Sequence, residues 1–141
     1  MAVWQICFYL IDRNRSISDT DVCYWDNEPD NVYNISFLPL IDGWSNDIIQ
    51  YGDLQKTCIE LLKENNKVIE ISVRLDVRTT IVSQINCLVN YANSINAYVY
   101  YQGAVMIPSK DVFIKMIKQS DAYRFCKRPL MFISDISKGS S

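Results

Sequence analysis

The stretch from Ile69 to Val77 alternates without interruption between apolar and polar side chains, and no other pattern in the 141 residues constrains the fold as much. Successive side chains of a β-strand point to opposite faces of its sheet, so this strand has one apolar and one polar face. The polar face carries Glu70, Ser72, Arg74 and Asp76. Such a strand belongs to an antiparallel sheet with a core on one side and water on the other.

A second apolar run, Thr57–Leu62, precedes this strand and predicts a β-hairpin with Lys67–Val77. Two loops would fit the intervening residues. A three-residue loop over 64–66 places Ile59 opposite Ile71, whereas a two-residue loop opposes apolar to polar side chains. Because the buried face fixes the register, we predict the three-residue loop.

The N-terminal half predicts one buried strand followed by a long excursion. Val3–Ile11 is almost entirely apolar or aromatic, which is typical of a strand covered on both faces. Residues 12–43 are rich in Asp and Asn and contain one short predicted strand, Tyr33–Leu38. The apolar residues of Trp44–Tyr51 recur at helical spacing before Gly52, so we predict a short helix there.

The C-terminal half predicts a helix, two strands and a second helix. Thr79 or Thr80 caps the first helix, whose apolar positions are Ile81, Ile85, Leu88, Val89 and Ala92. Strands Ala97–Tyr101 and Ala104–Ile107 turn at Gln102-Gly103. Pro108-Ser109 opens a helix that carries Phe113, Met116 and Ile117 inward, and Tyr123–Ile133 is expected to be irregular chain or an edge strand.

This order predicts a single domain over residues 1–141, with Lys138–Ser141 as a disordered tail. The predicted fold class is α+β, an antiparallel sheet with helices on one face. Its first six elements match the ferredoxin-like split βαβ plan, to which one strand and one helix are added. Because many unrelated functions share that plan, it does not assign chemistry.

The chain contains no histidine, which excludes Ser-His-Asp and Cys-His nucleophiles, His-ligated zinc and an imidazole base. The five cysteines are odd in number and form no C-x-x-C pair, so we predict free thiols in a reducing compartment rather than disulfides or a zinc site. A catalytic thiolate would need Lys or Arg beside it. We predict no catalytic residue, no metal and no cofactor.

Charge is distributed unevenly, although the net charge is only −2. Residues 16–55 contain eight acidic residues and no Lys or Arg, whereas residues 109–141 carry seven basic residues against three acids. Acids interleaved with aromatic residues indicate a surface that meets a basic protein partner. The predicted partner-binding residues are Asp19, Asp21, Tyr24, Trp25, Asp26, Glu28 and Asp30.

Three alternatives compete with that interpretation. The acids could simply solvate a loop, or Asp19 and Asp21 could begin a calcium loop, although the glycine and glutamate that such a loop needs are missing. In the third, Glu70–Asp76 on the polar face of the sheet serves a small enzyme or a ligand-binding domain.

Partner classes other than protein are disfavoured. The isoelectric point near 5.0 and the absence of a glycine-rich or RNA-binding motif argue against nucleic acid. No apolar run is long enough to span a bilayer, and residues 1–15 lack the basic start and long apolar region of a signal peptide. We therefore expect a cytoplasmic protein that does not bind membranes.

Three segments resemble small immunity proteins of contact-dependent inhibition and related polymorphic toxin systems. They are Trp44-Ser45-Asn46-Asp47-Ile48 with Gly52-Asp53, then Ile69–Arg78, and Ser120–Phe125. The resemblance lies in style, size and charge, and it supplies no site residues. It implies a cytoplasmic, non-enzymatic protein that binds and neutralises a toxin domain, often by covering a basic nuclease surface.

Overall fold

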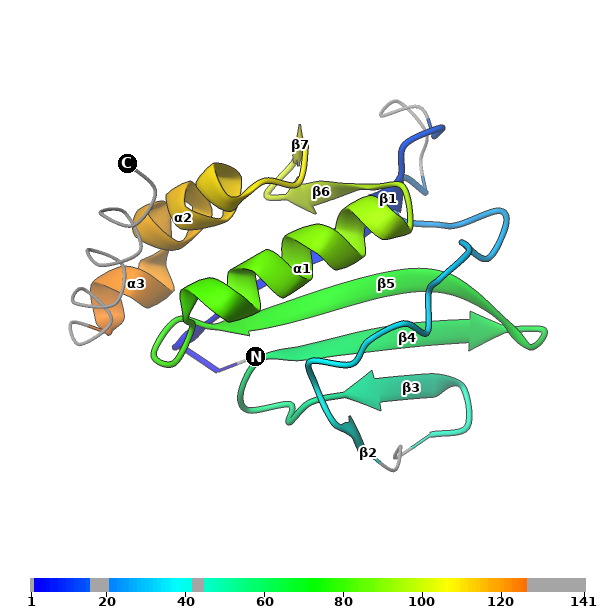
Figure 1. Ribbon diagram of the computed structural model, residues 1–141, viewed down its shortest axis with the longest axis horizontal. Coiled ribbons are helices and arrows are strands. Elements are labelled where there is room, and N and C mark those ends of the chain that lie inside the picture. The colour runs from blue at the N-terminus through cyan, green and yellow to red at the C-terminus, as the bar shows by residue number, and fades with distance from the viewer. Residues whose placement is uncertain (1, 16–20, 42–44, 127–141) are drawn as a thin grey trace.

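The computed structural model describes residues 2–15, 21–41 and 45–126 and contains one seven-stranded sheet (Figure 1). Every pair of neighbouring strands is antiparallel. In sheet order the strands are β2 (Leu40–Ile41), β3 (Ile48–Tyr51), β4 (Cys58–Glu64), β5 (Lys67–Asp76), β1 (Gln5–Asp12), β6 (Ala97–Tyr101) and β7 (Ala104–Met106). The described helices are α1 (Val82–Ser94), α2 (Lys110–Gln119) and α3 (Asp121–Phe125). The predicted α+β class is confirmed.

One split βαβ unit is present, formed by β5, α1 and β6. Both strands run antiparallel to β1, which lies between them, so they are parallel to each other. The helix predicted over Trp44–Tyr51 is wrong, because Ile48–Tyr51 is strand β3 and Trp44 lies outside the described residues. Strand β3 therefore occupies the place in the chain where the first helix was expected.

The β3 segment is a strand because its backbone pairs with the outer side of β4. Ile48 pairs with Leu62 and Tyr51 with Ile59, and Tyr51 is buried. Gly52 then turns the chain at φ +87°, where a Cβ atom would approach the Thr57 carbonyl oxygen to 2.4 Å. Gly52 is thus the turn after a strand and not the end of a helix.

The excursion before β3 also differs from the prediction. No strand forms over Tyr33–Leu38, whereas the two-residue strand β2 follows it. Val32, Ile35 and Leu38 are nevertheless buried in the core. These three apolar residues, spaced three apart, all point into the core from an irregular segment. The sequence pattern did not distinguish this segment from a strand.

The β4–β5 hairpin has a different loop from the one predicted. Ile59 pairs with Val73 rather than Ile71, and a two-residue turn, Asn65-Asn66, joins the strands. Both asparagines have positive φ, 53° and 64°, as a type I′ turn requires. Asn tolerates this conformation better than most residues, so local backbone chemistry selects the shorter loop.

A β-bulge reconciles the short loop with the buried face. Lys63 lies opposite Val68, but Leu62 lies opposite Glu70, so Ile69 is the additional residue in β5. The bulge shifts the register by one and restores the match of apolar with apolar side chains from Leu61 and Ile71 onward. The principle that the buried face fixes register holds, although the predicted loop was wrong.

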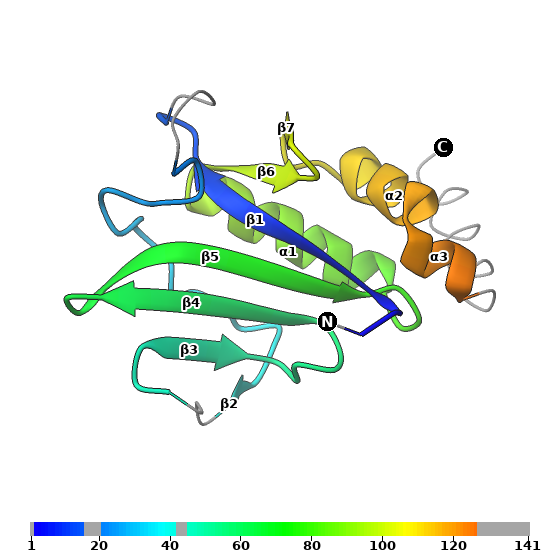
Figure 2. The ribbon, with the colours of Figure 1, turned by 180° about the vertical axis from the view of Figure 1, so that it is seen from behind.

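The core fills the space between the sheet and the elements that cover one of its faces. Phe8 of β1 meets Phe113 of α2 edge to face, with ring centroids 5.4 Å apart. Residues 25–38 cover the rest of this face beside α1 (Figure 1). Viewed from behind, the opposite face of the sheet has none of the described helices in front of it (Figure 2).

The helix starts agree with the sequence only in part. Helix α2 begins after Pro108-Ser109 as predicted, and Ser109 caps it by accepting a hydrogen bond from the Val112 N–H at 3.1 Å. Neither threonine caps α1: its N-cap is Ile81, which is 48% exposed, and Thr80 donates to the Asp76 carbonyl oxygen instead. Helix α3 includes the described start of the segment predicted as irregular or strand; residues 127–141, including the predicted tail, lie outside the described residues.

Candidate functional site

The seven predicted partner-binding residues have different environments in the structure. Asp19 lies outside the described residues. Asp21, Asp26 and Asp30 are exposed. Tyr24 and Glu28 are half-buried, and Trp25 is buried. Only part of the acidic segment therefore exposes its side chains.

Trp25 was predicted as a surface anchor and is instead a core residue, 3% exposed. Its indole Nε1–H donates to the Leu10 carbonyl oxygen at 2.9 Å, and its backbone N–H donates to the Ile69 carbonyl oxygen at 2.7 Å. These bonds attach the segment to β1 and to the bulge of β5. Trp25 therefore stabilises the fold and contributes very little exposed surface.

Glu28 was predicted as a rim charge, but its carboxylate is used within the fold. It accepts hydrogen bonds from the Val68 N–H at 2.9 Å and from the Tyr33 hydroxyl at 2.8 Å. Burial and this hydrogen bond to Glu28 raise the pKa of Tyr33 to about 12. The Glu28 carboxylate is thus a tertiary clamp between the segment and β5.

Asp26 and Tyr24 share a basic neighbour from just before the segment. The Arg15 guanidinium lies 2.8 Å from the Asp26 carboxylate and 5.6 Å from the centre of the Tyr24 ring. Lys67 also donates to the Asp26 backbone carbonyl at 3.1 Å. Tertiary contacts therefore supply cations that the linear segment lacks, and they partly neutralise Asp26.

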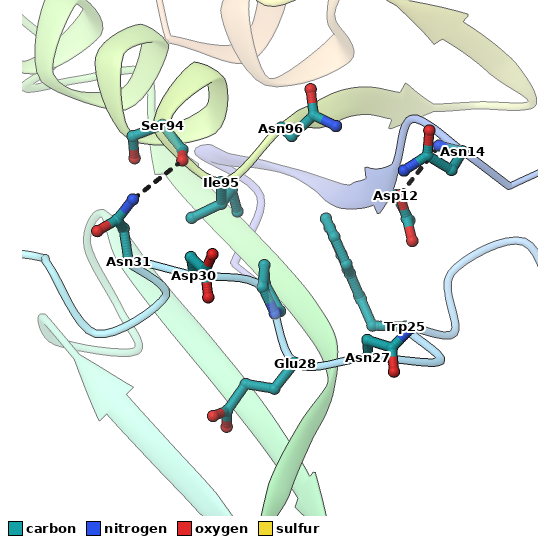
Figure 3. Close-up of a pocket in the computed structure, with 11 residues that line it drawn as sticks. Asp12, Asn14, Trp25, Asn27, Glu28, Asp30, Asn31, Ser94, Ile95 and Asn96 are labelled. Atoms are coloured by element: carbon teal, nitrogen blue, oxygen red, sulfur yellow. Dashed lines mark hydrogen bonds between the residues drawn. The ribbon is translucent and has the colours of Figure 1, made fainter.

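A groove of about 470 Å³ lies where this segment meets the ends of β1 and α1 (Figure 3). We call it the acidic groove. Asp12 enters it from the end of β1 and Asp30 from the loop, and Figure 3 shows Glu28 extending away from both. The lining contains no Lys or Arg; it consists of Asp12, Asn14, Trp25, Asn27, Glu28, Pro29, Asp30, Asn31, Ser94, Ile95 and Asn96.

The geometry of the acidic groove is fixed by backbone turns. Asn31 and Asn96 adopt positive φ angles of 67° and 58°, and the Asn31 side-chain amide donates to the Ser94 carbonyl oxygen at 3.4 Å. Asp12 accepts a hydrogen bond from the Asn14 N–H at 3.0 Å. The lining residues contributed by β1 and by the end of α1 were missed, because nothing in the sequence indicates that these termini meet.

Arg13 follows Asp12 directly in the sequence, and its guanidinium is bound by residues of β6 and α1. The Arg13 guanidinium donates to the Ala97 carbonyl oxygen and to the Asn93 side chain, and it lies 5.1 Å from the centre of the Tyr98 ring. Arg13 is not among the residues that line the acidic groove, although its partners Asn93 and Ala97 are the sequence neighbours of the lining residues Ser94 and Asn96.

The polar face of β5 holds ion pairs where acid–base chemistry was the alternative. Arg74 lies 3.4 Å from the Glu60 carboxylate of β4. Asp76, predicted to face water, is fully buried and accepts two hydrogen bonds from the Arg78 guanidinium at 3.0 Å each. Glu70 lies in a hollow of about 180 Å³, and burial raises the pKa of its carboxyl group.

All five cysteines are free thiols. Burial raises the pKa of Cys58 and of Cys23 to about 11, which keeps both protonated at neutral pH. Among the described residues, no three His, Cys, Asp or Glu side chains come together as a metal site. No described helix is long and apolar enough to cross a bilayer.

Comparison of the chain with protein-family models, with curated proteins and with solved structures finds no match in any of the three. The site is therefore interpreted from its own geometry.

Proposed function

We propose that this is a non-enzymatic binding protein that neutralises a basic protein partner, with the acidic groove as its recognition site. The observation that carries the proposal is a concave surface that Asp12 and Asp30 both line, with no basic side chain in the lining. The immunity-type resemblance of the sequence refines the proposal: the partner is a bacterial toxin domain, and neutralisation takes place in the cytoplasm.

The groove has the chemistry to accept a guanidinium or ammonium group. Asp30 is exposed and makes no side-chain hydrogen bond or ion pair with the described residues. Carboxylates accept short, charge-assisted hydrogen bonds from Arg and Lys, and Arg pairs with them in a bidentate manner. The amide groups of Asn14, Asn27 and Asn96 line the same groove and add further hydrogen-bonding groups around such a cation.

A second candidate is supported by Glu70. A carboxyl group of raised pKa in a hollow with Ser72 and Glu60 is the arrangement from which a ligand-binding or general-acid site is built. The hollow is small and its neighbour Arg74 is already paired with Glu60. We therefore rank this alternative below the acidic groove.

Parallel affinity capture from the source cell tests the proposal with three baits. They are the wild-type chain, Asp12→Asn/Asp30→Asn, and a matched control, Asp47→Asn/Glu64→Gln, which removes two exposed acids that are not in the groove lining. We expect a basic protein to be recovered by the wild type and the control and depleted on the groove variant. Its association rate should fall about 3- to 10-fold on the groove variant, with a weaker dependence on salt.

The same three chains are then tested for protection of cells that express the captured protein. Loss of protection by the groove variant alone is expected. A captured protein that is acidic, or that binds all three chains with equal rate and salt dependence, would show that the groove is only solvated surface.

A further inference from the structure

Strand β7 forms one edge of the described sheet and β2 forms the other. Which hydrogen-bonding groups of β7 point outward follows from the turn that precedes it. Gln102 and Gly103 have φ angles of 49° and 81°, which make a type I′ turn between β6 and β7. In such a hairpin the residues that flank the turn, Tyr101 and Ala104, form a hydrogen-bonded pair. Because the pattern alternates, the N–H and C=O of Val105 point away from β6.

Strand β7 is short, which itself limits pairing at an edge, but its three residues carry none of the side-chain or bulge features that protect edge strands. Ala104–Met106 contains no charged residue, and Ile107, which follows it, is 65% exposed. Lysine, proline or a bulge within an edge strand commonly prevents a further strand from pairing with it. None of these occurs within β7, and the first proline follows at position 108.

A groove of about 410 Å³ runs beside β7, between the β6–β7 hairpin and α2. Its floor is apolar, made by Tyr101, Met106, Val112 and Met116. Its rim carries Gln102, Lys115 and Gln119, and no carboxylate lines it. It shares no lining residue with the acidic groove and has the opposite charge.

We propose that an extended peptide segment of a protein partner binds here by adding a strand to β7. The main chain of the peptide pairs with the outward N–H and C=O of Val105. Since side chains alternate along a strand, every second one enters the groove between β7 and α2. The groove fits an apolar side chain followed, two residues along, by an acidic one that meets Lys115. This site does not depend on the acidic groove.

The probes are two acetylated and amidated peptides, Thr-Val-Thr-Leu-Thr-Glu-Thr and the same peptide with Lys in place of Glu. Binding is measured by NMR titration of the ¹⁵N-labelled full chain. We expect saturable shifts of the Val105 and Ile107 amides and slower hydrogen exchange of the Val105 N–H with the Glu peptide. The Lys peptide should bind more weakly.

Two substitutions separate the parts of the proposal. Val105→Pro removes the outward N–H without breaking a bond to β6 and should weaken binding at least about tenfold, whereas Val105→Thr keeps the N–H and should bind as the wild type does. Lys115→Glu should exchange the preference between the two peptides. Lys56→Glu, the same charge change at an exposed residue outside the groove, should not.

Three results would overturn the proposal. The first is the absence of saturable shifts at Val105 and Ile107, or their appearance at other residues. The second is equal binding by Val105→Pro and Val105→Thr when both variants give folded spectra. The third is a concentration-dependent dimer of the wild type that Val105→Pro abolishes, since a second copy of the chain would then be the occupant.

Discussion

Replacing Trp25 by alanine distinguishes most sharply between a surface anchor and a core residue. The sequence placed Trp25 among acids at a partner surface, whereas the structure buries it to 3% exposure. A surface position predicts little change in folding stability. A core position predicts a large one, and the two expectations differ by several kcal/mol.

The magnitude follows from the contacts. Truncating a buried Trp to Ala costs about 3–5 kcal/mol through lost apolar burial and the cavity that remains. The substitution also removes the hydrogen bond that the indole N–H donates to the Leu10 carbonyl oxygen at 2.9 Å. The expected loss of stability therefore lies in the upper half of that range. Since small domains are stable by about 5–15 kcal/mol, Trp25→Ala should remove about a quarter or more of the total.

Two further variants divide the effect into its parts. Trp25→Phe keeps an aromatic ring but removes the hydrogen bond to Leu10, and we expect a loss of about 1–2 kcal/mol. Trp4→Ala is the matched control. Trp4 is only half-buried, its indole N–H donates to the Gln55 carbonyl oxygen at 2.8 Å, and Arg78 lies 4.0 Å from its ring centre. Together these contacts of a half-buried side chain should be worth about 1–2 kcal/mol.

The assay is urea unfolding followed by far-UV circular dichroism, because fluorescence would itself change when a tryptophan is removed. Comparison of the m-values shows whether each variant unfolds the same surface as the wild type. A Trp25→Ala protein within about 1 kcal/mol of the wild type, and no less stable than Trp4→Ala, would refute the core assignment and return Trp25 to the partner surface.

Two other predictions concern the hairpin and the thiols. Asn66 has φ 64°, so Asn66→Ala should lower the free energy of unfolding by about 1 kcal/mol, whereas Asn66→Gly should not. Both variants are measured by urea titration. Equal losses of stability in the two would contradict the type I′ turn. Burial raises the pKa of Cys58 from 9.0 to about 11, so folding favours the protonated thiol; its stabilisation is complete below pH 9 and is lost as the pH rises toward 11. The free energy of unfolding should fall there by up to about 1.4 kcal/mol per pH unit from this group, and Cys58→Ala should show a shallower fall.

The elements that the sequence predicted correctly are those set by local pattern. Strand β5 alternates in polarity, the β6–β7 hairpin turns at Gln102-Gly103, and α2 begins after Pro108-Ser109 as expected. Each of these depends on residues that are close in sequence. Turn chemistry and side-chain periodicity act at that range, so they are visible in the sequence without knowledge of the fold.

Most of the errors arose where a distant partner decided the outcome. The apolar residues of Trp44–Tyr51 fit a helical spacing, but pairing of Ile48 with Leu62 makes the described part a strand. In the hairpin, the tolerance of Asn65-Asn66 for positive φ was a local signal that the prediction missed, whereas the bulge at Leu62/Lys63 has no local signal. The acidic groove needs Asp12 opposite Ala97 in the β1–β6 register before Asn96 can approach it. Such a juxtaposition follows only from the complete sheet.

The acidic segment illustrates why composition alone overstated the binding surface. Trp25 and Asp26 are adjacent, yet one enters the core and the other pairs with Arg15 at the surface. Glu28 faces inward to Val68, and Asp30 returns to the groove. An acidic run that folds against a sheet therefore divides into structural and exposed charges.

Neutralising the whole run would confuse loss of stability with loss of binding, whereas Asp12 and Asp30 can be changed without removing an apolar core contact. The two-residue groove variant is for this reason a cleaner test of partner recognition than removal of every acid in the segment.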